Sequence, residues 1–146
     1  ITGESGGLAF GIYTAIAYWA LGQILIVIAT ALYDRMMPYS LHDEIEKDNN
    51  AAGVAFAGLI IAVANLIRHG LMGNFESWDQ TLLEVAYETG IGLVVLPLIR
   101  TLVDRILLPG RKLSDEIAAQ EKPNVGAGLI EAFGYIGGSV LIIWCI

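Results

Sequence analysis

The chain has 146 residues, of which 55% are hydrophobic and only 16% are charged, and its formal net charge is −7. Soluble domains are typically about 45–50% apolar and about 25% charged, so this composition indicates a membrane protein. The negative net charge argues against nucleic acid as a partner, because nucleic-acid binding needs clustered Lys and Arg.

Four apolar segments are long enough to span a bilayer, which requires about 20 residues in a helix. In chain order they lie near 8–32, 50–72, 81–108 and 124–146. Backbone groups in lipid must be hydrogen bonded within their own segment, so each segment is predicted to be a transmembrane helix. We therefore expect an all-α integral membrane protein with four transmembrane helices, forming a single domain over residues 1–146. A signal peptide is the alternative for the first segment, but no basic residue precedes it.

The same pattern occurs twice along the chain. The matching motifs are Leu32-Tyr33-Asp34-Arg35 with Asp43-Glu44-Ile45, and Leu102-Val103-Asp104-Arg105 with Asp115-Glu116-Ile117. In each copy an apolar segment precedes the charged block and a second apolar segment follows it, over about 8–72 and about 81–146. The duplication predicts two helical hairpins that run in the same direction, as two parallel repeats.

Lys and Arg concentrate in the two charged blocks, which contain six of the eight such residues. The positive-inside rule places segments rich in Lys and Arg on the cytoplasmic side of the membrane. We therefore expect a multi-pass protein of the bacterial inner membrane with cytoplasmic charged blocks and both termini outside.

Four polar residues stand where helices are expected to begin. Ser40 and Ser114 adjoin the acidic residues of the charged blocks, and Asn50 and Asn124 open the second and fourth apolar segments. Ser and Asn side chains accept hydrogen bonds from backbone N–H groups at helix N-termini. We expect all four to be helix caps, and contact with a lipid headgroup or a partner is the alternative.

Two ionisable residues, Arg100 and Glu131, lie inside predicted transmembrane helices. At about 1.5 Å rise per residue, both lie roughly 10–12 Å from the predicted inner interface. Their matched depth predicts an ion pair that fixes the register of the third and fourth helices. Because intramembrane charges are often functional, a proton or cation path is the alternative.

A second polar group lies near the predicted outer ends of the second and third helices: Asn65, Arg68, His69, Glu84 and Glu88. The two glutamates are four residues apart and therefore share one helix face. We expect a structural polar cluster, with an ion or partner site and a metal site as alternatives. Metal ligation normally requires three or more convergent ligands, so no metal or cofactor is predicted.

Small residues recur at helical spacing on three of the predicted helices. They are Gly7, Gly11 and Ala15 on the first, Ala51, Ala55, Gly58 and Ala62 on the second, and Gly134 and Gly138 on the fourth. Helices associate in lipid largely through close backbone approach at such residues. We expect them to pack the bundle internally, or to mediate self-association.

The acid-rich stretch 43–50, followed by Ala51-Ala52-Gly53-Val54-Ala55-Phe56-Ala57-Gly58, resembles the signature of the YjfL-like bacterial inner-membrane proteins. The chain departs from that pattern at Asn49, where the family has Gly, and at Pro123 in the second copy. The resemblance implies two tandem two-helix units and a domain of unknown function, in proteins associated with envelope-stress or membrane-organisation systems. It implies no catalytic residue.

No P-loop, HExxH, GxSxG or CxxC motif occurs, so we expect no enzymatic activity. The sequence favours a non-enzymatic membrane scaffold or accessory subunit, with lipids and other membrane proteins or further copies of itself as partners. A small oligomeric channel or ion-translocating component that uses the intramembrane Glu and Arg is the alternative. Lipid handling in a groove between the two halves is a third interpretation.

Overall fold

The computed structural model describes residues 7–107, 109–118 and 122–146. In this part of the chain all regular structure is helical: α1 (Gly7–Met36), α2 (Leu41–Glu46), α3 (Asn50–Gly70), α4 (Trp78–Leu107), α5 (Leu113–Ala118) and α6 (Val125–Cys145). Helices α1, α3, α4 and α6 are long and apolar enough to cross a membrane. The prediction of an all-α protein with four membrane-length helices is confirmed.

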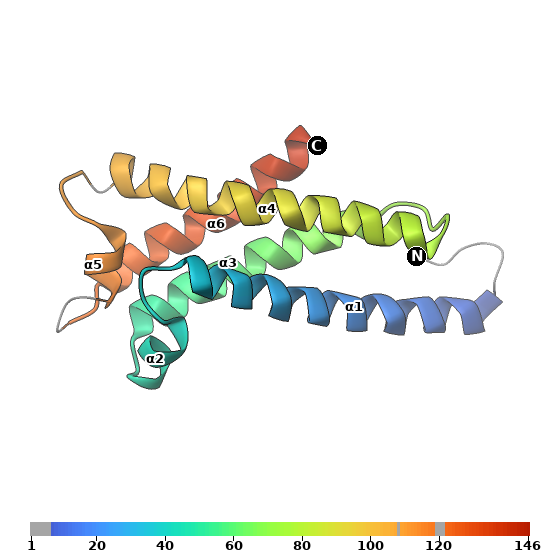
Figure 1. Cartoon of the computed structure of the whole chain (residues 1–146), viewed down its shortest axis with the longest axis horizontal. Coiled ribbons are helices and arrows are strands. Elements are labelled where there is room, and N and C mark those ends of the chain that lie inside the picture. Colours follow the sequence, from blue (N-terminus) through green and yellow to red (C-terminus); the bar gives the residue numbers. More distant parts are fainter. Residues whose placement is uncertain (1–6, 108, 119–121) are drawn as a thin grey trace.

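The four long helices form an elongated bundle, with the short helices α2 and α5 at the same end (Figure 1). Helices α1 and α4 have 30 residues each, whereas α3 and α6 have 21 each. At about 1.5 Å per residue these lengths are about 45 Å and about 32 Å. Only the shorter pair matches the hydrocarbon thickness of about 30 Å.

The ends of the long pair differ from the apolar segments that predicted them. Helix α1 continues past Leu32 through Asp34 and Arg35, and α4 begins at Trp78 rather than at residue 81. Helical hydrogen bonding continues into polar sequence until the backbone is obstructed. For α1 the obstruction is Pro38, which disfavours helical dihedral angles at the residue before it.

Helices α3 and α6 form the tightest contact of the bundle. A Cβ atom on Gly58 would lie 2.4 Å from the Cα atom of Ala132, and one on Gly128 would lie 2.4 Å from the carbonyl oxygen of Ala51. Side chains larger than hydrogen are therefore excluded at both glycines. Close backbone contact of this kind is what holds helices together in lipid.

The other small-residue ridges behave differently from one another. Gly138 faces α4, since a Cβ atom there would lie 2.3 Å from the Cδ1 atom of Ile99. On α1, by contrast, Gly7 and Ala15 are exposed. The α1 ridge is therefore not buried at these two positions, so internal packing does not account for it there and self-association remains the alternative.

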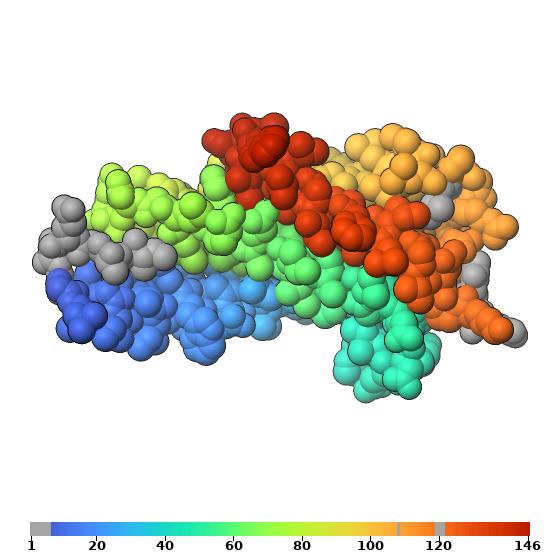
Figure 2. Space-filling model, turned by 180° about the vertical axis from the view of Figure 1, so that it is seen from behind, coloured from blue at the N-terminus to red at the C-terminus, as the bar shows by residue number. Residues whose placement is uncertain are grey.

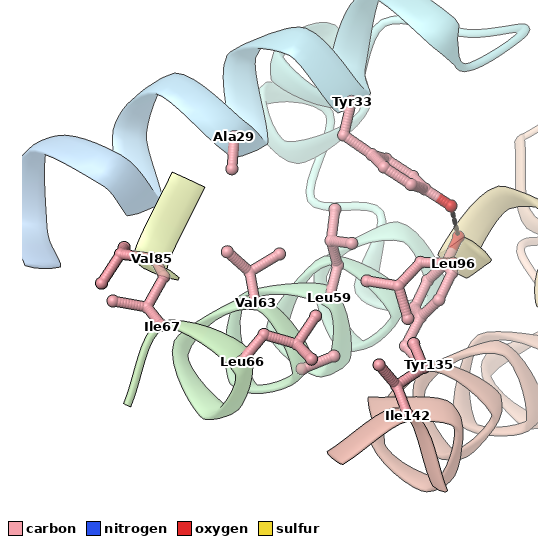
Figure 3. Packing of buried hydrophobic residues seen from close by; sticks show 11 residues of the cluster. Ala29, Tyr33, Leu59, Val63, Leu66, Ile67, Val85, Leu96, Tyr135 and Ile142 are labelled. Atoms are coloured by element: carbon pink, nitrogen blue, oxygen red, sulfur yellow. Dashed lines mark hydrogen bonds between the residues drawn. The ribbon is translucent and has the colours of Figure 1, made fainter. Parts of the chain in front are cut away.

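The buried core draws on all four long helices, as Figure 3 shows, but unequally. Helix α1 contributes only Ala29 and Tyr33 to it. Near its other end, α1 contacts α4 through Tyr18, whose ring centroid lies 5.7 Å from that of Trp78. Most large apolar side chains of α1 are exposed, so lipid or partner proteins must cover this helix.

From the opposite side of the molecule, α6 lies across the bundle and α2 projects from it (Figure 2).

Two of the predicted caps occupy their expected places. The Ser40 Oγ atom accepts a hydrogen bond from the Asp43 backbone N–H at 3.4 Å and caps α2. The Asn124 Oδ1 atom accepts from the Ala127 backbone N–H at 3.3 Å and caps α6.

The other two cap assignments need correction. Helix α3 is capped by Asn49, whose Oδ1 atom accepts from the Ala52 N–H at 3.0 Å, and Asn50 is its first helical residue. The backbone of Asn49 is extended, as an N-cap requires. Ser114 lies inside α5 and accepts a hydrogen bond from Arg100 instead.

The two charged blocks share a hydrogen-bond pattern. The Asp34 Oδ1 atom accepts from the Leu41 N–H at 2.9 Å, and the Asp104 Oδ1 atom accepts from the Leu113 N–H at 2.6 Å. In the same way, the side-chain amides of Asn49 and Asn124 donate to Glu44 and Glu116, respectively. These bonds align Asn49, rather than Asn50, with Asn124. They favour the interpretation of the chain as a duplicated unit.

Candidate functional site

A polar network lies among the helices near the end of the bundle that carries α2 and α5. The Arg100 Nε atom donates to the Glu131 Oε1 atom at 2.8 Å, so the structure brings together the two residues of matched depth. The Glu131 side chain is only 1% exposed and that of Arg100 14%. The pair joins α4 to α6 in a region from which solvent is excluded.

Two tyrosines extend this network to α1. The Tyr135 Oη atom donates to the Glu131 Oε1 atom at 2.5 Å, and the Tyr33 Oη atom donates to the Tyr135 Oη atom at 2.6 Å (Figure 3). On the other side, the Arg100 Nη2 atom donates to the Ser114 Oγ atom at 3.1 Å. The network therefore connects α1, α6, α4 and α5.

Neither tyrosine is among the site residues predicted from the sequence, although the sequence contains a signal for each. Tyr135 lies four residues after Glu131, which places both on one helix face. Tyr33 belongs to the first Leu-Tyr-Asp-Arg motif, where the second copy has Val103. The network thus includes a residue at which the two copies differ.

The network leaves two polar atoms unsatisfied. Within the described residues, the Glu131 Oε2 atom and the Tyr39 Oη atom are buried without a hydrogen-bond partner of normal geometry. Both residues line one crevice, together with Tyr33 and Tyr135, that is too narrow for a water molecule. Burial raises the pKa of the Tyr39 phenol, so this side chain remains neutral. The Glu131 Oε2 atom can therefore still accept a hydrogen bond or a proton.

The predicted outer cluster separates into two groups and one isolated residue. The His69 Nδ1 atom lies 2.8 Å from the Glu88 Oε2 atom and links α3 to α4. The Asn65 side chain donates to Ser139 on α6 and accepts from the Arg68 Nη2 atom at 3.1 Å. Glu84 takes part in neither group. It is exposed and accepts a hydrogen bond from Gln80.

No three His, Cys, Asp or Glu side chains converge as metal ligands in the described part of the chain. The His69 and Glu88 pair supplies two candidate ligands, and Glu84 is not a third. As arranged, these polar contacts connect α3 to α4 and α6 at the end opposite α2 and α5.

Two open clefts lie on the lipid-facing surface of the bundle. One, of about 560 Å³, lies between α4 and α6 and is lined by apolar side chains and by Gly134, Gly137 and Gly138. The other, of about 290 Å³, lies between α1 and α3 and includes Arg68 at its edge.

Comparison with known proteins assigns the chain to a family. The model of the family described as Domain of Unknown Function (DUF350) matches residues 7–146. A relative described as UPF0719 transmembrane protein YshE, from Bacillus subtilis, is 27% identical over 126 residues, which cover 86% of this chain and 87% of the relative. No solved structure gives a significant match.

These matches agree with the expectation of a multi-pass membrane protein that has a domain of unknown function. The narrower resemblance to the YjfL-like proteins stays a prediction. The chain belongs to the DUF350 family of membrane proteins.

Proposed function

We propose that this protein is a non-enzymatic scaffold or accessory subunit of the bacterial cytoplasmic membrane, which binds a transmembrane helix of a partner protein. The end that carries α2 and α5 faces the cytoplasm and both termini lie outside, because six of the eight Lys and Arg residues lie in the charged blocks.

The observation that carries the proposal is the groove between α4 and α6. A Cβ atom on Gly137 would meet no atom within 4 Å, so the backbone of α6 is accessible there. Exposed apolar side chains, among them Phe133 and Leu141, stand on the same helix beside it. Because helices in lipid associate where small residues allow close approach, this groove suits a partner helix.

Filling the groove tests the proposal. Gly137→Leu adds a side chain where space is open, and Gly90→Leu adds the same side chain at another open position, on α4. The protein is extracted from its native membrane in mild detergent, and the mass and composition of its complex are measured. We expect the partner to be lost from the Gly137 variant and retained by the Gly90 variant. Equal retention by both variants would contradict the proposal.

A second candidate, proton or cation translocation, is favoured by the unsatisfied Glu131 Oε2 atom beside Tyr39. In this case proteoliposomes would carry a proton flux under an imposed potential, detected with an enclosed pH dye. Loss of that flux in Glu131→Gln, with retention in the exposed Glu46→Gln control, would support translocation. A wild-type flux equal to that of protein-free vesicles would exclude it.

A further inference from the structure

The cleft between α1 and α3 is built from both helices and remains open to lipid. Its walls include Tyr18, Trp19, Gly22 and Ile26 of α1 and Ala64 and Ile67 of α3. It lies between the Tyr18–Trp78 ring contact and the buried Ala29 and Tyr33, which are two of the places where α1 contacts the rest of the bundle. The backbone of α1 is accessible from the cleft at Gly22, because this residue has no side chain and a Cβ atom there would meet no other atom within 4 Å.

Arg68 lines the same cleft and lacks a counter-charge. Its guanidinium donates to the Asn65 Oδ1 atom at 3.1 Å and to the Met72 Sδ atom at 3.0 Å. A guanidinium has five N–H donors. The amide oxygen and the thioether sulfur, which is a weak acceptor, occupy only two of them, so three N–H donors stay free. Across the described residues no carboxylate forms an ion pair with Arg68; Glu88 pairs with His69 instead, and Glu84 accepts a hydrogen bond from Gln80.

The position of Arg68 matches the depth of lipid headgroups. It lies two residues before the end of α3 at Gly70, and the cleft continues from it along apolar side chains. A guanidinium binds phosphate through two parallel N–H···O bonds, and apolar walls favour a hydrocarbon chain.

We infer that this cleft binds one anionic phospholipid, whose phosphate accepts hydrogen bonds from Arg68 and one of whose acyl chains packs against Trp19 and Gly22. An anionic lipid is preferred over a zwitterionic one because no headgroup ammonium then competes for the phosphate or repels the guanidinium. This site lies on a different face from the α4–α6 groove, so it stands independently of the proposed scaffold function.

Trp19 is a natural reporter of occupancy, because it lines the cleft. The full chain has three tryptophans, and replacing Trp78 and Trp144 with Phe leaves Trp19 as the single tryptophan, which can be excited selectively over the tyrosines. This variant is reconstituted into phosphatidylcholine vesicles containing a fixed fraction of phosphatidylglycerol brominated on its acyl chains. Brominated phosphatidylcholine at the same fraction measures random contact with bulk lipid.

We expect brominated phosphatidylglycerol to quench Trp19 with about fivefold higher apparent affinity than brominated phosphatidylcholine, the effect of one Arg beside a lipid phosphate. Arg68→Gln should remove this preference. Arg35→Gln, in the last turn of α1 and far from the cleft residues of that helix, should retain it. Gly22→Leu should expel the chain and reduce the preference, and Gly137→Leu in the other cleft should leave it unchanged.

Equal quenching by the two brominated lipids in the parent variant would overturn the inference, as would a preference that survives Arg68→Gln. If Arg68→Gln does not fold, the Gly22→Leu result decides, because that substitution enters open space. Loss of the partner complex in the scaffold experiment has no bearing on this readout, so the two proposals fail separately.

Discussion

Replacing Glu131 with Gln leaves the Arg100 guanidinium without a counter-charge inside the bundle. The two side chains are 1% and 14% exposed and their charged atoms lie 2.8 Å apart, so solvent screens them little. Removing one partner of a buried pair typically costs about 3–5 kcal/mol, because the other charge remains buried and unpaired. We expect Glu131→Gln and Arg100→Met each to lower the free energy of unfolding by about this amount.

The double variant removes both charges and should therefore lose less than the sum of the single losses. A double-mutant cycle on the free energy of unfolding in detergent micelles should give a coupling of about 2–3 kcal/mol. Lys47→Met provides the control, because Lys47 is 68% exposed in its pair with Glu44 and such pairs contribute about 0–1 kcal/mol. Additive losses, or single-variant losses no larger than that of the control, would refute the structural role of the pair.

Three further predictions concern packing, the network and a helix cap. Gly58→Leu should abolish or strongly weaken the α3–α6 contact, seen as a loss of several kcal/mol in unfolding, whereas Gly53→Leu, in open space, should cost far less. Tyr135→Phe removes a hydrogen bond to a carboxylate and should lower the free energy of unfolding by about 1.5–3 kcal/mol; an unchanged value would show that this bond contributes nothing. Asn49→Ala should cost more than about 1 kcal/mol, because it removes the α3 cap together with the hydrogen bonds to Glu44 and to the Ile117 carbonyl oxygen, while Asn50→Ala should have little effect; the reverse order in thermal unfolding would restore Asn50 as the cap.

The bundle could be predicted from the sequence because membrane-length apolar segments have few alternatives. Charge inside such segments is rare, which is why the matched depth of Arg100 and Glu131 predicted their contact. Buried small residues of α3 were also recognisable from their spacing. On α1 the same spacing did not predict burial, since a ridge of small residues does not specify which neighbour, if any, it contacts.

The finer parts of the site depended on information that the sequence does not carry. Tyr33 and Tyr135 look like ordinary apolar-face residues until packing brings their hydroxyl groups together. Asn49 and Asn50 suit the cap position equally, and only the backbone conformation decides between them. Glu84 shares a helix face with Glu88, but its carboxylate bonds to Gln80 instead of joining the cluster.

The central claim, that a partner helix lies in the α4–α6 groove, is tested most directly by photo-crosslinking in the native membrane. A photoreactive residue in place of Leu141, which is exposed on the groove wall, should form a protein adduct that disappears with Gly137→Leu and persists with Gly90→Leu. Lipid adducts alone, or a protein adduct indifferent to Gly137→Leu, would contradict the claim.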